Sequence, residues 1–222
     1  MSTSEHVRDK SAILLTGLAG LAAAILVGAG EFMLQFNPLG GYESPDYAYF
    51  GRIPIDRLTA GHFLAVLSAP LYVAGYWHIF KMLEPAGKKL SCLVFLLGGY
   101  SFIIGTAWIS QRIFLGLTVH EINGGADLSG LLTAFAERNE PFVNVLRVAI
   151  LLISAIWIFL IAGGKSHYPR WMAIFSPFLI LASIFALYFV HPLVGLYILP
   201  IAMNLTHGVV FCLSLLVAMR LK

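Results

Sequence analysis

The chain has 222 residues, of which 59% are hydrophobic and only 11% are charged, and its mean hydropathy is +0.85. Soluble domains carry about 25% charged residues, so the composition excludes a soluble globular protein and indicates an integral membrane protein. A net charge of +3 is too small to indicate nucleic acid as a partner. The two cysteines, Cys92 and Cys212, form neither a CxxC motif nor a disulfide framework.

Six apolar stretches are long enough to cross a bilayer, because a hydrocarbon core of about 30 Å needs about 20 helical residues. In chain order they cover residues 11–30, 58–80, 90–110, 141–164, 171–190 and 192–219. The sequence therefore predicts an all-α, polytopic bundle of six transmembrane helices that forms a single domain over residues 1–222. Arg8 and Lys10 precede the first stretch as in a signal peptide, but its apolar run is too long for one, so we expect a retained anchor.

Basic residues predict the orientation, because lysine and arginine resist translocation. Nine of them fall on the side of the two termini and five on the other side, where most of the acidic residues lie. Both termini are therefore predicted to be cytoplasmic. The two outer loops, residues 36–57 and 112–140, are long, and long ordered loops tend to be functional.

Each outer loop has a pattern of its own. The second loop has apolar residues at helical spacing, namely Leu128, Leu131, Leu132 and Phe135. This spacing predicts a short amphipathic helix, which we expect to rest on lipid rather than to act as a moving lid over a cavity. The first loop has aromatic residues among glycine and proline, namely Tyr42, Tyr47, Tyr49 and Phe50. Such residues are typical of anchors at the membrane interface.

Polar side chains recur in the outer half of the predicted spans. They are Glu31, His62, Gln111, Arg112, Asn144, Arg147, Asn204 and His207. Ionisable groups are costly in lipid and usually face the bundle interior or a water-filled cavity. Their shared depth predicts a pocket that is open to the outside. Aromatic residues are expected to form its floor, namely Tyr72, Tyr76, Tyr100 and Trp108.

These residues also have purely structural interpretations. Glu31 and Arg147 could form only a buried ion pair that fixes the helix register. Asn204 could simply hydrogen-bond across helices, and His62 and His207 could be satisfied core histidines. Both interpretations of Glu31 and Arg147 require the same residues, so the sequence leaves them open.

Gln111 and Arg112 have a structural alternative too. They could mark the membrane surface, with the arginine side chain reaching toward water.

On the first span, Gly20, Ala24 and Gly28 repeat every four residues. Such small-residue faces allow close helix packing. This face is a candidate partner surface, and a homo-oligomer is left open.

The sequence contains none of the standard catalytic signatures, such as HExxH, GxSxG or GxGxxG. A metal site would use Glu31, His62 and His207 as ligands, with Asn204 behind them. Acid/base chemistry would use either histidine to move a proton, with Glu31 orienting the ring and Arg147 binding an anionic group. No local spacing favours a metal or a haem, and the cofactor is left unknown.

The whole chain resembles an uncharacterised family of bacterial six-helix integral membrane proteins. The resemblance lies in residues 28–33 with Asn37 and Pro38, in residues 57–72, in residues 168–172 and in Asn204. At the position of Glu31 the family more often has aspartate, so this chain keeps the charge on a longer arm. The resemblance implies the fold and a bacterial inner-membrane location, but it names no substrate.

Three functions therefore compete. The leading hypothesis is a membrane protein whose outward-facing pocket binds a small amphipathic molecule or a lipid head group, with transport of that molecule left open. The second is an intramembrane enzyme that modifies a lipid by a metal or by histidine acid/base chemistry. The third is a structural subunit of a membrane complex, in which the polar residues only hold helices together.

Overall fold

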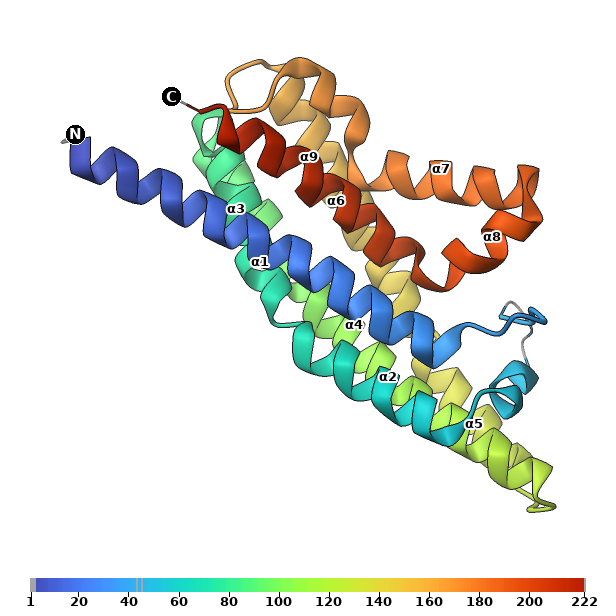
Figure 1. Ribbon diagram of the computed structural model, residues 1–222. Coiled ribbons are helices and arrows are strands. Elements are labelled where there is room, and N and C mark those ends of the chain that lie inside the picture. The colour runs from blue at the N-terminus through green and yellow to red at the C-terminus, as the bar shows by residue number, and fades with distance from the viewer. Residues whose placement is uncertain (1–2, 43, 45, 222) are drawn as a thin grey trace.

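The computed structural model describes residues 3–42, 44 and 46–221, and the elements in this part of the chain are all helices (Figure 1). The α-helices are α1 (Thr3–Gln35), α2 (Ile55–Ser68), α3 (Leu71–Leu83), α4 (Lys88–Asn123), α5 (Ser129–Asn139), α6 (Pro141–Ala162), α7 (Pro177–Val190), α8 (Pro192–Ile198) and α9 (Ala202–Met219). Short 3-10 helices lie between them, namely η1 (Ala48–Arg52), η2 (Glu84–Ala86), η3 (Arg170–Phe175) and η4 (Leu199–Ile201). The predicted all-α class is confirmed.

Five helical stretches of the described chain are long and apolar enough to cross a membrane. They are Asp9–Gln35, Ile55–Ala86, Lys88–Asn123, Ser129–Ala162 and Pro192–Met219. A sixth apolar helix, Pro177–Val190, is shorter. The helices therefore indicate a multi-pass membrane protein, and the count agrees roughly with the six predicted spans.

The fifth predicted span, residues 171–190, is not one continuous helix. It divides into η3 and α7 at Ser176, whose backbone is extended (φ −66°, ψ 148°) and precedes Pro177. A residue before proline is driven out of the helical region, so the break follows from the sequence. With 14 residues, α7 is only about 21 Å long. It begins beside the middle of α6, because the Phe178 amide donates to Ser154 Oγ at 2.8 Å.

The second predicted span is also interrupted. α2 ends at Ser68, and α3 begins at Leu71 after Pro70. Proline lacks the amide that would continue the hydrogen-bond ladder, so the two helices do not share one unbroken register. Pro200 interrupts the last span in the same way, between α8 and α9.

Most of the predicted outer loop 112–140 is helical. α4 continues for 36 residues to Asn123, well past the predicted end of the third span at residue 110. After a turn at Gly124 and Gly125, α5 covers Ser129–Asn139. The short helix predicted from the leucine spacing is therefore present, and it leads directly into α6 at Pro141.

The small-residue face of α1 is used within the chain itself. A Cβ placed on Gly20 would lie 2.7 Å from the Cα of Gly75 on α3, and one on Gly28 would lie 3.1 Å from the Asn204 side chain on α9. Gly30 and Gly61 meet in the same way between α1 and α2. Only glycine allows backbones to approach so closely, so the face of Gly20 and Gly28 packs α1 against α3 and α9 and is not a free partner surface, while Gly30 packs α1 against α2.

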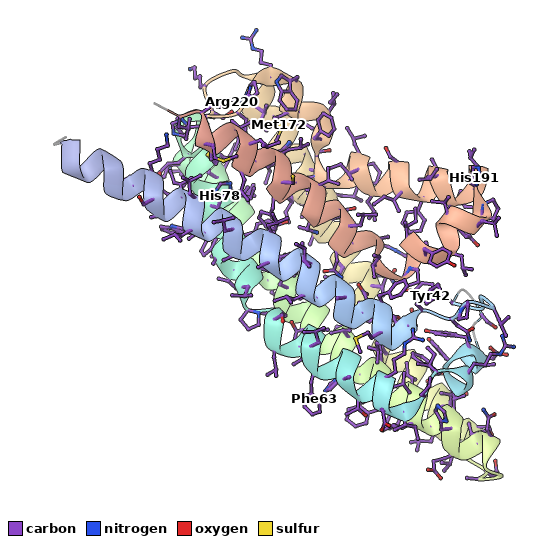
Figure 2. The ribbon with its side chains drawn as sticks, in the orientation of Figure 1. Tyr42, Phe63, His78, Met172, His191 and Arg220 are labelled. Atoms are coloured by element: carbon purple, nitrogen blue, oxygen red, sulfur yellow. The ribbon has the colours of Figure 1, made fainter. Side chains whose placement is uncertain are left out.

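Both described ends of the chain lie at the same end of the bundle, and the η1 region and the α4–α5 turn lie at the opposite end (Figure 1). Figure 1 also shows α7 leaving the bundle at an angle, with α8 leading back to α9. Figure 2 places His191 at the turn of this hairpin, directly before Pro192 at the start of α8. Which end faces the cytoplasm stays a prediction, and two residues of the charge count, Glu43 and Lys222, lie outside the described residues.

Candidate functional site

A cavity of about 1030 Å³ is lined by residues of α1, α3, α4, α5, α6, α7 and α9 and of the loop after α1. The α6 and α7 wall is mainly apolar, with Ile150, Leu151, Ile153, Phe178, Leu181 and Phe185. The wall from α1, α3, α4 and α9 carries the hydrogen-bonding groups Glu31, Tyr76, Arg112, Asn204 and His207. Ligand pockets in proteins have about this volume and combine apolar surface with a few converging polar groups.

At the end of the bundle away from the termini, the cavity is bordered by loop and helix residues together. Tyr42 and Tyr47 come from the loop after α1, and Ala136 and Glu137 come from α5. Phe135, on another face of α5, is exposed. The amphipathic helix therefore borders the cavity and does not only rest on lipid.

Glu31 is a buried residue of the polar wall and lies near the end of α1, which continues to Gln35. Its carboxylate accepts a hydrogen bond from the Gln35 amide at 3.1 Å and another from the Asn204 amide. The Tyr72 hydroxyl donates to Oδ1 of Asn204 at 2.6 Å. Gly28, one turn before Glu31, leaves the space in which Asn204 approaches α1.

The ion pair between Glu31 and Arg147, one of the two interpretations that the sequence left open, is not formed. Glu31 turns toward α9, and none of the ion pairs found among the described residues includes it. Arg147 lines the cavity from α6, but it is exposed and donates to Asn144 Oδ1 at 3.1 Å. Asn144 itself is not among the lining residues.

His207 lies on the polar wall, one helical turn after Asn204 on α9. Its Nδ1 is 2.8 Å from the Met203 carbonyl, which can only accept, so Nδ1 carries the proton. Nε2 is then the acceptor for the Tyr76 hydroxyl at 3.0 Å. The ring of Phe102 meets His207 edge to face, with centroids 5.1 Å apart. Both ring nitrogens of this neutral histidine are therefore occupied.

Arg112 lines the cavity and is buried, so the alternative that it reaches toward water at a membrane boundary does not hold. Only 3% of the residue is exposed. Its guanidinium donates to the Tyr49 hydroxyl at 2.7 Å and to Glu140 Oε1 at 3.2 Å. The rings of Tyr47, Phe50 and Trp108 surround it, with centroids 5.0 to 5.4 Å from Cζ. Such cation–π contacts partly replace the hydration that the buried charge loses.

The aromatic loop after α1 is therefore not an interface anchor. Tyr47, Tyr49 and Phe50 are buried around Arg112, which the sequence could not show because their partner lies on α4. Tyr47 has a φ of +55°, an unfavourable region for a residue with a side chain. Its hydroxyl donates to Glu140 Oε1 at 2.6 Å. Burial raises the pKa of Tyr42, Tyr47 and Tyr49, and the nearby Arg112 charge opposes this rise.

Several predicted site residues lie away from the cavity. His62 is not among its lining residues, since the break at Pro70 separates α2 from the register of Tyr72 and Tyr76 on α3. Gln111 also lies outside and accepts from Asn139 at 3.5 Å. Tyr100 is half exposed and contributes nothing to the predicted floor, to which Tyr76 and Trp108 do contribute.

The proposed metal ligands are not brought together. Glu31 and His207 line the cavity, whereas His62 does not. Across the described part of the chain, no three His, Cys, Asp or Glu residues lie close enough to hold an ion. The set of Glu31, His62 and His207 is therefore wrong as a ligand set.

A family model matches residues 8–220 of the chain. The chain belongs to DUF6796, a family of unknown function. This confirms the resemblance to an uncharacterised family. No curated protein and no solved structure is significantly similar to the chain, so the chemistry of this DUF6796 protein has to be argued from its own residues.

The DUF6796 protein has a second buried polar cluster, which the sequence did not reveal. His78 Nδ1 donates to the Ile13 carbonyl at 2.7 Å, so Nε2 accepts from Ser214 Oγ at 2.6 Å. The Tyr168 hydroxyl lies 2.6 Å from the same Ser214 oxygen. All three side chains are buried, and none of them lines the large cavity. The cluster ties α1, α3, α9 and the loop before η3 together, and no substrate can reach it there.

Proposed function

We propose that this DUF6796 protein binds a small amphipathic molecule or lipid in the cavity between its polar and apolar walls. The observation that carries the proposal is the contrast between the two walls. The α6 and α7 wall offers surface for an apolar chain, and Glu31, Arg112 and Asn204 on the opposite wall offer hydrogen bonds to a head group. An amphiphile satisfies both walls at once, whereas water or an ion satisfies only the polar one.

The charge distribution of the sequence supports an orientation with both termini in the cytoplasm of a bacterial inner membrane. The η1 loop and α5 would then cover the cavity on the outer side. In this orientation a molecule would enter from outside or from the outer leaflet. Transport across the bilayer is a further step that the proposal does not require.

Native mass spectrometry of protein extracted in a mild detergent tests this proposal. Ala182 lines the cavity on α7 and its neighbour Ser183 does not, so Ala182→Trp fills the cavity while Ser183→Trp adds the same bulk outside it. We expect wild type and Ser183→Trp to retain a lipid-sized mass and Ala182→Trp to lose it. Absence of a bound mass in wild type, or equal retention in both variants, would overturn the proposal.

A second candidate function is an intramembrane enzyme that modifies a lipid by acid/base chemistry. The observation that favours it is the hydrogen bond between Tyr76 and His207 at the cavity wall, where a neutral histidine and a phenol can exchange a proton. Comparing membrane lipid profiles for wild type and His207→Gln tests this candidate. A product that disappears in the variant supports it, and identical profiles contradict it.

A further inference from the structure

Two buried N–H groups in the polar wall have no acceptor among the described residues. They are Nε1 of Trp108 and Nε of Arg112, one helical turn apart on α4, and both residues line the cavity. The guanidinium carbon lies 5.0 Å from the Trp108 ring. Buried donors almost always have a partner in the protein, in ordered water or in a ligand. These two therefore point to an acceptor that the ligand supplies.

Glu31 has the opposite deficit. Its carboxylate accepts two amide hydrogen bonds, from Gln35 and Asn204, but no cation of the described chain lies within ion-pair distance of it. Arg112 pairs instead with Glu140 at 3.2 Å and forms no ion pair with Glu31. A buried carboxylate is stable as an anion only when a positive charge compensates it. The missing charge points to a cationic group on the ligand.

The two deficits border the same cavity. Glu31, Trp108 and Arg112 all line it, as does the Tyr42 phenol. A head group that reached both deficits would therefore need to carry both a positive and a negative charge. A purely anionic head group would meet Glu31 and Glu140 unfavourably, and a purely cationic one would leave both α4 donors without an acceptor.

Building on the function proposed above, we infer that the cavity takes an amphiphile with a zwitterionic head group. Its ammonium lies against Glu31, and an oxygen of its phosphate or carboxylate accepts from Trp108 and Arg112. The aromatic rings of Tyr42 and Tyr76 line the same cavity as Glu31 and offer favourable contacts for the ammonium. The apolar chain then follows the α6 and α7 wall.

Lipid titrations of the delipidated full-length protein, read by native mass spectrometry, test the head group. The probes are phosphatidylethanolamine, which is zwitterionic, and phosphatidylglycerol, which is anionic. We expect wild type to prefer phosphatidylethanolamine by about tenfold or more in dissociation constant, which is about 1.4 kcal/mol. Glu31→Gln keeps a hydrogen-bonding side chain but removes the charge, so this preference should fall to near onefold.

Two further variants separate binding from folding. Trp108→Phe removes one N–H and keeps an aromatic ring. It should weaken the binding of both lipids severalfold without changing the preference for phosphatidylethanolamine. Glu121→Gln removes an exposed carboxylate that does not line the cavity. Its affinities for the two lipids should equal those of wild type. Unchanged selectivity in Glu31→Gln at wild-type melting temperature would overturn the inference.

The outcomes also separate this inference from the function on which it rests. If wild type binds both lipids equally and Ala182→Trp abolishes both, the cavity binds amphiphiles but the zwitterionic assignment is wrong. If Ala182→Trp weakens the binding of neither lipid, the function proposed for the cavity fails as well. Competition by free glycerophosphoethanolamine would indicate that the head group alone suffices and that a soluble molecule is the source.

Discussion

The Tyr72 hydroxyl on α3 donates a 2.6 Å hydrogen bond to Oδ1 of Asn204 on α9. The amide of the same asparagine donates to Glu31 on α1. One side chain therefore uses both its acceptor and a donor to tie three helices together at the cavity wall. Because Asn204 lies beside Gly28, close helix packing and this polar connection depend on each other.

We expect Asn204→Ala to destabilise the protein more than Tyr72→Phe does. Removing Asn204 leaves the Tyr72 hydroxyl and one carboxylate oxygen of Glu31 without their partner, at a cost of about 1–3 kcal/mol for a buried unsatisfied group. Tyr72→Phe removes a single interhelical hydrogen bond, for which about 0.6 kcal/mol is typical in membrane proteins. Unfolding free energies in detergent micelles check the order, and equal losses would show that Asn204 contributes no more than one bond.

Glycine contacts give a second prediction. A Cβ on Gly20 would meet the Gly75 backbone at 2.7 Å, whereas one on Gly99 would meet no atom within 4 Å. Gly20→Ala should therefore cost about 1–3 kcal/mol through overpacking. Gly99→Ala should be neutral or stabilising by up to about 1 kcal/mol, because alanine favours the helix. Melting temperatures measured side by side test this, and a loss in both variants would contradict it.

Hydrophobic length predicts most of the fold from the sequence, because a bilayer requires long apolar helices. Breaks inside these stretches are harder to place, since tolerance of Pro70, Pro177 and Pro200 depends on the tertiary surroundings. The break at Pro70 changes which α2 residues share a face with α3 and so accounts for the misplaced His62. Glu31 and Asn204, which lie next to small residues on unbroken helices, meet on the wall, in agreement with the shared depth that the sequence predicts.

The Arg112 site could not be predicted in the same way. Its partners come from the loop after α1 and from Glu140, which are distant in sequence, and no helical periodicity connects them. The density of tyrosine and phenylalanine in residues 42–50 was the available signal. This signal is ambiguous, because aromatic residues around a buried cation and aromatic residues at a membrane interface have the same composition.

Glu140 should contribute more to stability than its exposure indicates. Half of its side chain is exposed, and substitutions of such residues usually change stability by less than about 0.5 kcal/mol. Here Glu140→Gln removes the only acidic partner that the described chain gives to buried Arg112, so we expect a loss of about 1–3 kcal/mol. Glu137→Gln is the matched control, because Glu137 and its neighbour Arg138 are both about 70% exposed. Equal small effects in thermal unfolding would show that Tyr49 and the surrounding rings satisfy Arg112 without Glu140.

The buried phenols outside the spans predict a loss of stability in alkali. Burial raises the pKa of Tyr49 and Tyr168 above the ordinary value of 10.0, so the folded protein keeps protons that the unfolded chain releases. The unfolding free energy is therefore unaffected at neutral pH and falls as pH rises past 10, by up to about 1.4 kcal/mol per pH unit for each phenol.

Tyr168→Phe should reduce this slope of the unfolding free energy against pH. It should also lower the overall stability by loss of the hydrogen bond to Ser214. Tyr197→Phe, which removes an exposed phenol, is the control. Parallel unfolding curves and tyrosinate absorbance at increasing pH measure the slope, and an identical slope in Tyr168→Phe and wild type would refute the assignment, because the phenol would then ionise equally in the folded and unfolded states.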